Sequence, residues 1–156
     1  MTPTTKIDFR HRRMRQLDDV TDLVAILFPG NRNQQHAAAR ILIELKGADD
    51  LVPNMAYIER EHGISRRTLQ RARAKLARLG LIERISWMNT RYGGREGWRL
   101  STRFCAALRS LAAFTDRWAD QREPEKIMRD EAMANLIGHS RYGIHSTAAM
   151  HTTEED

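Results

Sequence analysis

Residues 63–80 read GISRRTLQRARAKLARLG, and this stretch decides the fold that the chain predicts. Gly63 suits a left-handed turn, Ser65 is a favourable helix N-cap, and Gly80 is a typical helix end. At about 100° per residue, the intervening helix places apolar side chains on one face and basic side chains on the other. The apolar face consists of Leu69, Ala72, Leu76 and Leu79. The segment therefore predicts a turn followed by an amphipathic helix over 65–79.

The flanking sequence predicts a short helix before this turn and a hairpin after the long helix. Alternation of apolar and polar residues indicates strands over 81–87 and 97–101, joined by a turn over 89–96. The run 51–53 is expected to add a short edge strand. The other predicted elements are helices from Asp18 or Asp19 to Phe28, over 34–46, over 55–62, from Ser101 or Thr102 through Trp118, and over 125–136. The predicted fold is mainly α with a small β-hairpin wing, an α+β fold in which helices flank a helix-turn-helix on both sides.

Composition predicts one compact domain between two polar ends. A chain of 156 residues with 41% hydrophobic residues is long enough for one core and short for two. Residues 1–15 turn from polar to basic without a helical or strand period, so they predict a flexible basic arm. Residues 138–156 are rich in Ser, Thr, His and small residues, which predicts a disordered tail. The domain is expected over 16–137, with its central part over 34–104.

Positive charge is concentrated in one part of the chain. The whole protein carries a formal net charge of +6. From Arg60 to Arg109 there are 13 basic and 3 acidic residues, a net +10, so the remainder of the chain is slightly acidic. Twelve of the basic residues in this block are arginines, whose guanidinium groups suit phosphates and guanine edges better than ammonium groups do. A basic block of this kind predicts a polyanionic partner.

The basic face of the helix over 65–79 has the composition of a surface that reads DNA bases. Arg67, Gln70 and Arg71 are predicted to contact base edges, because Arg and Gln side chains can make bidentate hydrogen bonds to guanine and adenine. Ala74 would allow close approach or contact a thymine methyl group. The pattern thus favours a helix that enters the major groove of double-stranded DNA.

The same helix carries further candidates for contact with the DNA backbone. These predicted contacts are Ser65, Arg66, Lys75 and Arg78. The alternative is that the arginines only solvate an exposed helix face. We disfavour it because the run lacks acidic residues at spacings of three or four. Arg73 falls beside the apolar face, where a packed stem, an internal ion pair and a DNA contact all remain open.

The predicted hairpin turn offers a second basic surface. Arg91, Arg95 and Arg99 surround the pair of glycines at 93–94, which permits a tight turn that can approach a DNA backbone closely. Arginines at such a tip suit a narrow minor groove or flanking phosphates. The alternative is an ordinary hairpin turn with solvating arginines.

Three further side chains are predicted to be buried in the domain. Trp87 and Trp98 are expected to pack across the strands and against the helices rather than to stack on bases. Cys105 is the only cysteine, so it has no disulfide partner within the chain, and it is expected to be a small buried residue of the following helix.

The order of these elements resembles that of winged helix-turn-helix DNA-binding proteins, and the whole chain resembles MarR-type regulators in element order and length. The resemblance to the winged helix covers about residues 34–104. It implies a transcriptional regulator, typically a repressor, that binds double-stranded DNA as a homodimer with interlocking terminal helices; many such regulators respond to small ligands or oxidants. The stretch GISRRTLQRA, residues 63–72, also looks like the helix-turn-helix modules of plasmid and phage replication or maintenance proteins. The alternatives are therefore binding to the origin DNA of a mobile element, and a winged helix that binds an acidic protein surface.

An apolar stripe on the flanking helices predicts self-association. It is longer than a small three-helix core should need, so we expect a homodimer. The predicted interface consists of Leu23, Val24, Leu27, Phe28, Phe104, Leu108, Leu111, Phe114 and Trp118. The alternative is that both helices complete the core of one monomer.

Motifs of enzymes and metal sites are missing from the sequence. The six histidines are scattered without a cysteine cluster or a His-Glu-x-x-His arrangement, and no phosphate-binding loop or nucleophile elbow is present. We therefore expect no enzymatic activity, no metal and no cofactor. The longest apolar run, 23–28, is too short to cross a bilayer, and the N-terminus lacks an apolar signal segment. The expected location is the cytoplasm, at the nucleoid.

Overall fold

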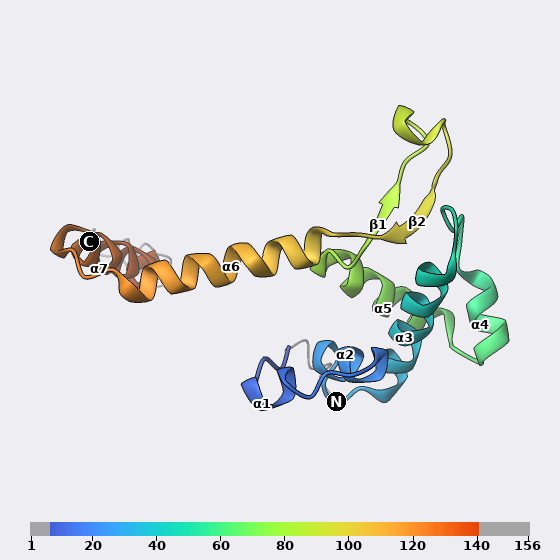
Figure 1. The fold of residues 1–156 in the computed structure, drawn as a ribbon, viewed down its shortest axis with the longest axis horizontal. Helices are drawn as coiled ribbons and strands as arrows, with labels where there is room; N and C mark the ends of the chain where they lie inside the picture. The colour runs from blue at the N-terminus through green and yellow to red at the C-terminus, as the bar shows by residue number, and fades with distance from the viewer. Residues whose placement is uncertain (1–6, 141–156) are drawn as a thin grey trace, which may run out of the picture. The chain divides into compact units, whose positions relative to one another are not determined.

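The computed structural model describes residues 7–140 and confirms a mainly helical fold with a small hairpin wing (Figure 1). The elements in chain order are α1 (His11–Met14), α2 (Val20–Leu27), α3 (Arg32–Gly47), α4 (Ala56–His62), α5 (Arg66–Leu79), β1 (Ile82–Ile85), the 3-10 turn η1 (Thr90–Tyr92), β2 (Gly97–Leu100), α6 (Arg103–Asp120) and α7 (Pro124–Ser140). Residues 1–6 and 141–156, which include most of the predicted tail, lie outside the described part.

The chain divides into two compact units, and the division falls within α6. The first unit ends at Leu108 and the second begins at Arg109. The domain predicted over 16–137 therefore spans parts of both units. Residues 138–140, predicted as the start of the tail, form the end of α7.

The core of the first unit is built around α3, which packs against both α2 and α5. Its buried residues include three consecutive alanines, 37–39, whose small side chains allow neighbouring elements to approach closely. Ile41, Leu42 and Leu45 supply the larger apolar surface of the same helix. Each fully buried side chain of this size stabilises the fold by about 1.5–3 kcal/mol through removal from water.

The apolar side chains of α2 belong to this core, which corrects part of the predicted dimer interface. Val24, Leu27 and Phe28 are 2%, 0% and 1% exposed. These side chains were expected to face a second copy, but they are already removed from water within the same unit. Leu23 and Phe104 are half-buried and pack against the same core.

The predicted turn between α4 and α5 is confirmed in its details. Gly63 has a φ of 60° in the left-handed region and ends α4. The Ser65 hydroxyl caps α5 by accepting a hydrogen bond from the backbone N–H of Thr68 at 3.2 Å. Gly80, with a φ of 81°, ends α5. These local interactions set the direction in which α5 leaves the turn.

The wing is a short antiparallel hairpin with a long connection. The pairing runs from Ile82 opposite Leu100 to Ile85 opposite Gly97. The predicted edge strand is confirmed as a single bridge, in which the backbone N–H of Val52 donates to the carbonyl of Trp98 at 3.0 Å and the carbonyl of Val52 accepts from the N–H of Trp98 at 2.8 Å. The strands are shorter than predicted, so the connection covers 86–96. It contains η1 at the tip of the hairpin (Figure 1).

The described part of the predicted basic arm is attached to the first unit. Ile7 packs against the core, and the backbone N–H of Asp8 donates to the carbonyl of Ile26 at 3.2 Å. A side-chain hydrogen bond from Arg10 lowers the pKa of Asp8 to about 2. One apolar side chain and one backbone bond thus connect the start of residues 7–15 to the first unit, and the flexibility of the arm stays a prediction.

The contact between Gly97 and Val52 should be sensitive to a single methyl group. A Cβ atom at Gly97 would lie 2.8 Å from the carbonyl oxygen of Val52, and the φ of Gly97 is 155°. We expect Gly97→Ala to lower the free energy of unfolding by about 1–3 kcal/mol. The control is Gly47→Ala, since Gly47 has open space around it and ordinary φ, and should leave stability unchanged or raise it by up to about 1 kcal/mol. Urea unfolding of both variants measures the difference, and equal stability of the two would contradict this packing.

Candidate nucleic-acid interface

The basic face of α5 is exposed, as the helical spacing predicts. Leu69, Ala72 and Leu76 are buried, so the opposite side of the helix must face outward. The exposed residues on that side are Arg67, Gln70, Arg71, Ala74 and Arg78, while Arg66 is exposed at its flank and Ser65 at the N-terminus of the helix. All the predicted contacts of the helix except Lys75 are therefore exposed.

The exposed arginines of α5 lack acidic partners among residues 7–140. No carboxylate of the described chain lies within 4.0 Å of the guanidinium groups of Arg66, Arg67, Arg71 or Arg78. Four unpaired guanidinium groups on one helix repel each other and create a local positive potential. An anionic ligand would relieve this repulsion, and Gln70 and Ala74 interrupt the charge with one amide and one small apolar side chain.

Lys75 does not belong to this surface. Its ammonium group donates a hydrogen bond to the backbone carbonyl of Leu27 and lies 4.6 Å from the centre of the Phe28 ring. Burial lowers the pKa of Lys75, and the nearby charge of Arg78 adds to this effect. The predicted phosphate contact is therefore wrong: the ammonium group neutralises the carbonyl end of α2.

Arg73, for which three roles were open, is a packed side chain. Its guanidinium carbon lies 5.0 Å from the centre of the Trp98 ring, an arrangement typical of a cation–π contact. Trp98 is half-buried and packs against the core, as predicted. Arg73 therefore joins α5 to β2.

Two of the three predicted wing arginines have acidic partners. Arg99 donates through Nε to Glu83 Oε1 at 2.6 Å, and this hydrogen bond raises the pKa of Arg99. Arg95 forms an ion pair with Asp50, and its Nε donates to the carbonyl of Tyr92 at 3.2 Å. Both contacts reduce the charge that these arginines can offer to DNA.

Arg91 differs from the other two wing arginines because no carboxylate of residues 7–140 pairs with it. It is exposed in η1, where the Asn89 side chain accepts a hydrogen bond from its backbone N–H at 3.1 Å. Of the three predicted contacts in the wing, Arg91 therefore has the most accessible charge.

Two expectations of burial are wrong in the region of the wing and α6. Trp87 is 63% exposed, because β1 ends at Ile85 and Trp87 lies in the turn that follows. Cys105, in α6, is also exposed. Strand alternation suggested the packing of Trp87, and the place of Cys105 on a helix suggested its burial, but neither signal shows whether another element covers the side chain.

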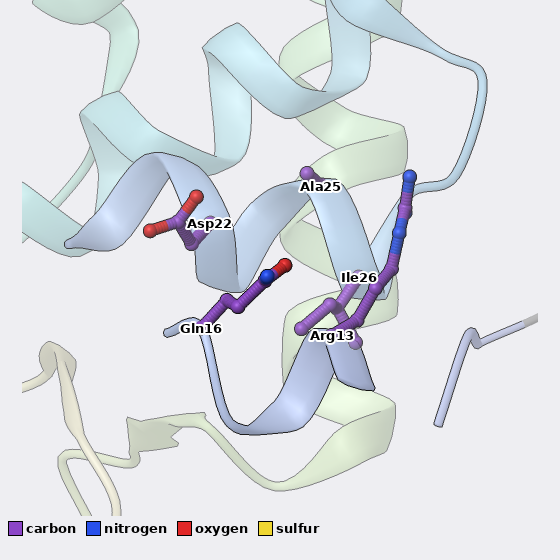
Figure 2. A pocket seen from close by; sticks show the side chains of 5 residues that line it. All are labelled: Arg13, Gln16, Asp22, Ala25 and Ile26. Carbon is purple, nitrogen blue, oxygen red and sulfur yellow. The ribbon is translucent and has the colours of Figure 1, made fainter. Parts of the chain in front are cut away.

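Three pockets of the first unit lack histidine and cysteine among the residues that line them. Figure 2 shows a pocket of about 250 Å³ that is lined by Arg13, Gln16, Asp22, Ala25 and Ile26. This volume is below the range of roughly 300–1,000 Å³ that is usual for small-molecule sites, whereas two other pockets of the first unit, of about 590 Å³ and 420 Å³, lie within that range. Within residues 7–140, no group of three or more histidine, cysteine or acidic side chains is placed to hold a metal ion.

No helix of residues 7–140 is both long and apolar enough to cross a membrane. Comparisons with protein-family models, with curated proteins and with solved structures gave no match. The geometry of α5 and the wing is therefore the basis for assigning a function.

The two roles assigned to neighbouring cations of α5 can be separated by stability measurements. We expect Lys75→Ala to lower the free energy of unfolding by about 1 kcal/mol, because it removes a charged hydrogen bond and a cation–π contact. Arg78 lies three residues after Lys75, on the exposed face of α5. We expect Arg78→Ala to change the free energy of unfolding by less than about 0.5 kcal/mol. Urea unfolding measures both values. An unchanged free energy of unfolding for Lys75→Ala would mean that Lys75 belongs to the exposed cations of α5.

Proposed function

We propose that this protein is a winged helix-turn-helix DNA-binding protein that recognises a specific sequence in double-stranded DNA and regulates transcription, most simply as a repressor. The observation that carries the proposal is the unpaired, exposed arginine face of α5. A solvated helix face would normally balance its charges, whereas this face is left without acidic partners in the described chain. The helix also follows a left-handed turn and precedes a hairpin, which is the order of a winged helix.

In the proposed complex, α5 enters the major groove. Arg67, Gln70 and Arg71 lie on the N-terminal half of its exposed face, where such helices approach base edges most closely. Their side chains would donate bidentate hydrogen bonds to guanine or adenine. Arg66 and Arg78 would neutralise phosphates and release counterions, which makes binding depend steeply on salt concentration.

The proposal includes a homodimer held by α6. Leu108, Leu111, Thr115 and Trp118 recur at alternating spacings of three and four, the pattern of a coiled-coil seam, and they continue the row of Phe104, which packs against the core of its own unit. Of these, Leu111 and Trp118 are 57% and 51% exposed, and Phe114 beside them is 58% exposed. A second copy would supply a matching seam and would place two α5 helices at a fixed spacing on a palindromic site.

A role at the replication origin of a mobile element would use the same contacts with DNA. An interaction module that binds an acidic protein would not bind duplex DNA. Selection from a random duplex library distinguishes a DNA-binding protein from such an interaction module, because only the DNA-binding protein enriches a sequence.

Arg71 should determine both affinity and sequence preference. We expect Arg71→Ala to weaken binding to the selected duplex by about 1–3 kcal/mol, roughly 5- to 150-fold, and to relax the preference at one base pair. Arg71→Lys keeps the charge but loses the bidentate geometry, so it should restore salt-dependent binding without the base preference. Arg129→Ala, an exposed arginine of α7, controls for the loss of one charge.

These variants are compared by fluorescence anisotropy on the selected duplex and on a scrambled duplex. Equal losses on both duplexes for Arg71→Ala would show that Arg71 binds phosphate and does not read a base. Binding to neither duplex by the unaltered protein would reject the proposed function itself.

A charge in the α6 seam should separate the two copies. We expect Leu111→Glu to convert the homodimer to a monomer, because an unpaired carboxylate in an apolar seam is costly to desolvate. Ala113→Glu places the same charge on the opposite side of the exposed helix and should leave the dimer intact. Light scattering at micromolar concentration gives the masses. A monomeric mass for the unaltered protein, with or without DNA, would reject the dimer.

A further inference from the structure

The wing exposes two large apolar side chains that the proposed contacts of α5 with DNA do not use. Trp87 and Met88 are 63% and 72% exposed, the highest values among the large apolar residues of the first unit from residue 7 onward. They follow β1 after one residue, Ser86, in the connection that extends beyond the two strands (Figure 1). Leaving two such side chains in water forgoes the stabilisation that burial would provide.

The backbone holds these two residues in a defined turn. The N–H of Asn89 donates to the carbonyl of Ser86 at 2.9 Å, which makes Trp87 and Met88 the two corner residues of a β-turn. The N–H of Met88 also donates to the Ser86 hydroxyl at 3.3 Å. The apolar pair is therefore preorganised, and a ligand that covers it need not order the backbone first.

The charges around the apolar pair favour an anionic ligand. Arg91 follows three residues after Met88 and is exposed without an acidic partner in residues 7–140. Arg95, on the other side of the connection, is held by Asp50 and by the carbonyl of Tyr92. A surface that combines apolar side chains with one accessible guanidinium fits the floor and the phosphate edge of a DNA groove better than it fits an apolar protein surface.

We propose that Trp87 and Met88 insert into the minor groove of the duplex that α5 binds, and that the wing thereby bends the DNA. This inference rests on the proposed function. Met88 acts as an apolar wedge between two base pairs, Trp87 covers the adjacent sugar and base edge, and Arg91 neutralises the flanking phosphate. The ligand class is thus a duplex with an easily unstacked pyrimidine–purine step, TA or CA, beside the sequence that α5 reads.

A fluorescent base reports insertion directly. The probe is the duplex selected from the random library, with 2-aminopurine placed in turn at each adenine of the flank, since unstacking of this base raises its emission. We expect the unaltered protein to brighten the probe at one step only. The double variant Trp87→Ala, Met88→Ala should abolish this signal and weaken binding about 10-fold, because it removes stacking and apolar contact.

Two controls distinguish insertion from other effects of the substitutions. Trp87→Phe keeps an aromatic surface and should retain most of the signal. Phe9→Ala removes an exposed aromatic side chain outside the wing, where Phe9 is 51% exposed, and should leave both signal and affinity unchanged. Replacing the TA or CA step by a stiff A-tract should weaken binding of the unaltered protein but not of the double variant.

The outcomes separate this inference from the proposed function. Sequence-specific binding without a brightened probe, or with a double variant of full affinity, would overturn the wedge and leave the DNA-binding function standing. A double variant that binds and bends DNA normally but loses association with a protein would assign the pair to a protein partner instead. Failure to select any duplex would reject the proposed function together with the inference.

Discussion

Burial of one face of α5 against α3 is the constraint on which the rest of the structure depends. Leu69, Ala72 and Leu76 are 2%, 0% and 0% exposed, and this packing fixes the rotation of α5 about its own axis. A helix whose apolar face is held in this way must present its remaining positions to solvent. The exposed arginine face is therefore a consequence of core packing, and it would be lost if the helix rotated.

The arginines of the first unit fall into two groups with different physical roles. Arg73 stacks on Trp98, and Arg99 bonds to Glu83, so these side chains connect elements of the fold. The arginines on the exposed face of α5 have no such partners in the described chain. Structural arginines use their charge internally, whereas unpaired ones keep it available for phosphates or base edges. Residues 60–109 carry a net charge of +10, but only the unpaired arginines among them are available to an anionic ligand.

The second unit leaves more of its large apolar side chains exposed than the first unit does. The indole Nε1 of Trp118 donates to Asp130 Oδ2 at 2.8 Å and joins α6 to α7. Within this helix pair, however, Leu111, Phe114 and Ile137 remain 57%, 58% and 69% exposed. Two helices that bury so little of each other have little packing energy to offset their loss of conformational entropy. This is the physical basis for proposing a second copy as their partner.

Local structure was predictable from the sequence because its causes lie within a few residues. The Gly63 turn, the Ser65 cap and the amphipathic period of α5 all depend on neighbours along the chain, and the structure confirms them. Their order also sufficed to predict the hairpin and the fold class. The length of the strands was less predictable, since it depends on where the pairing with Val52 and the core ends.

The sequence by itself determined which helix is amphipathic and that its polar face is basic. Only the tertiary structure decided which of those charges are free. Lys75 of this helix bonds to Leu27, 48 positions away. In the wing, Arg95 pairs with Asp50, 45 positions away. It likewise decided that the apolar face of α2 is covered within its own unit, while Trp87 is left in solvent. Such partnerships depend on distances across the folded core, and neither charge nor periodicity along the chain encodes those distances.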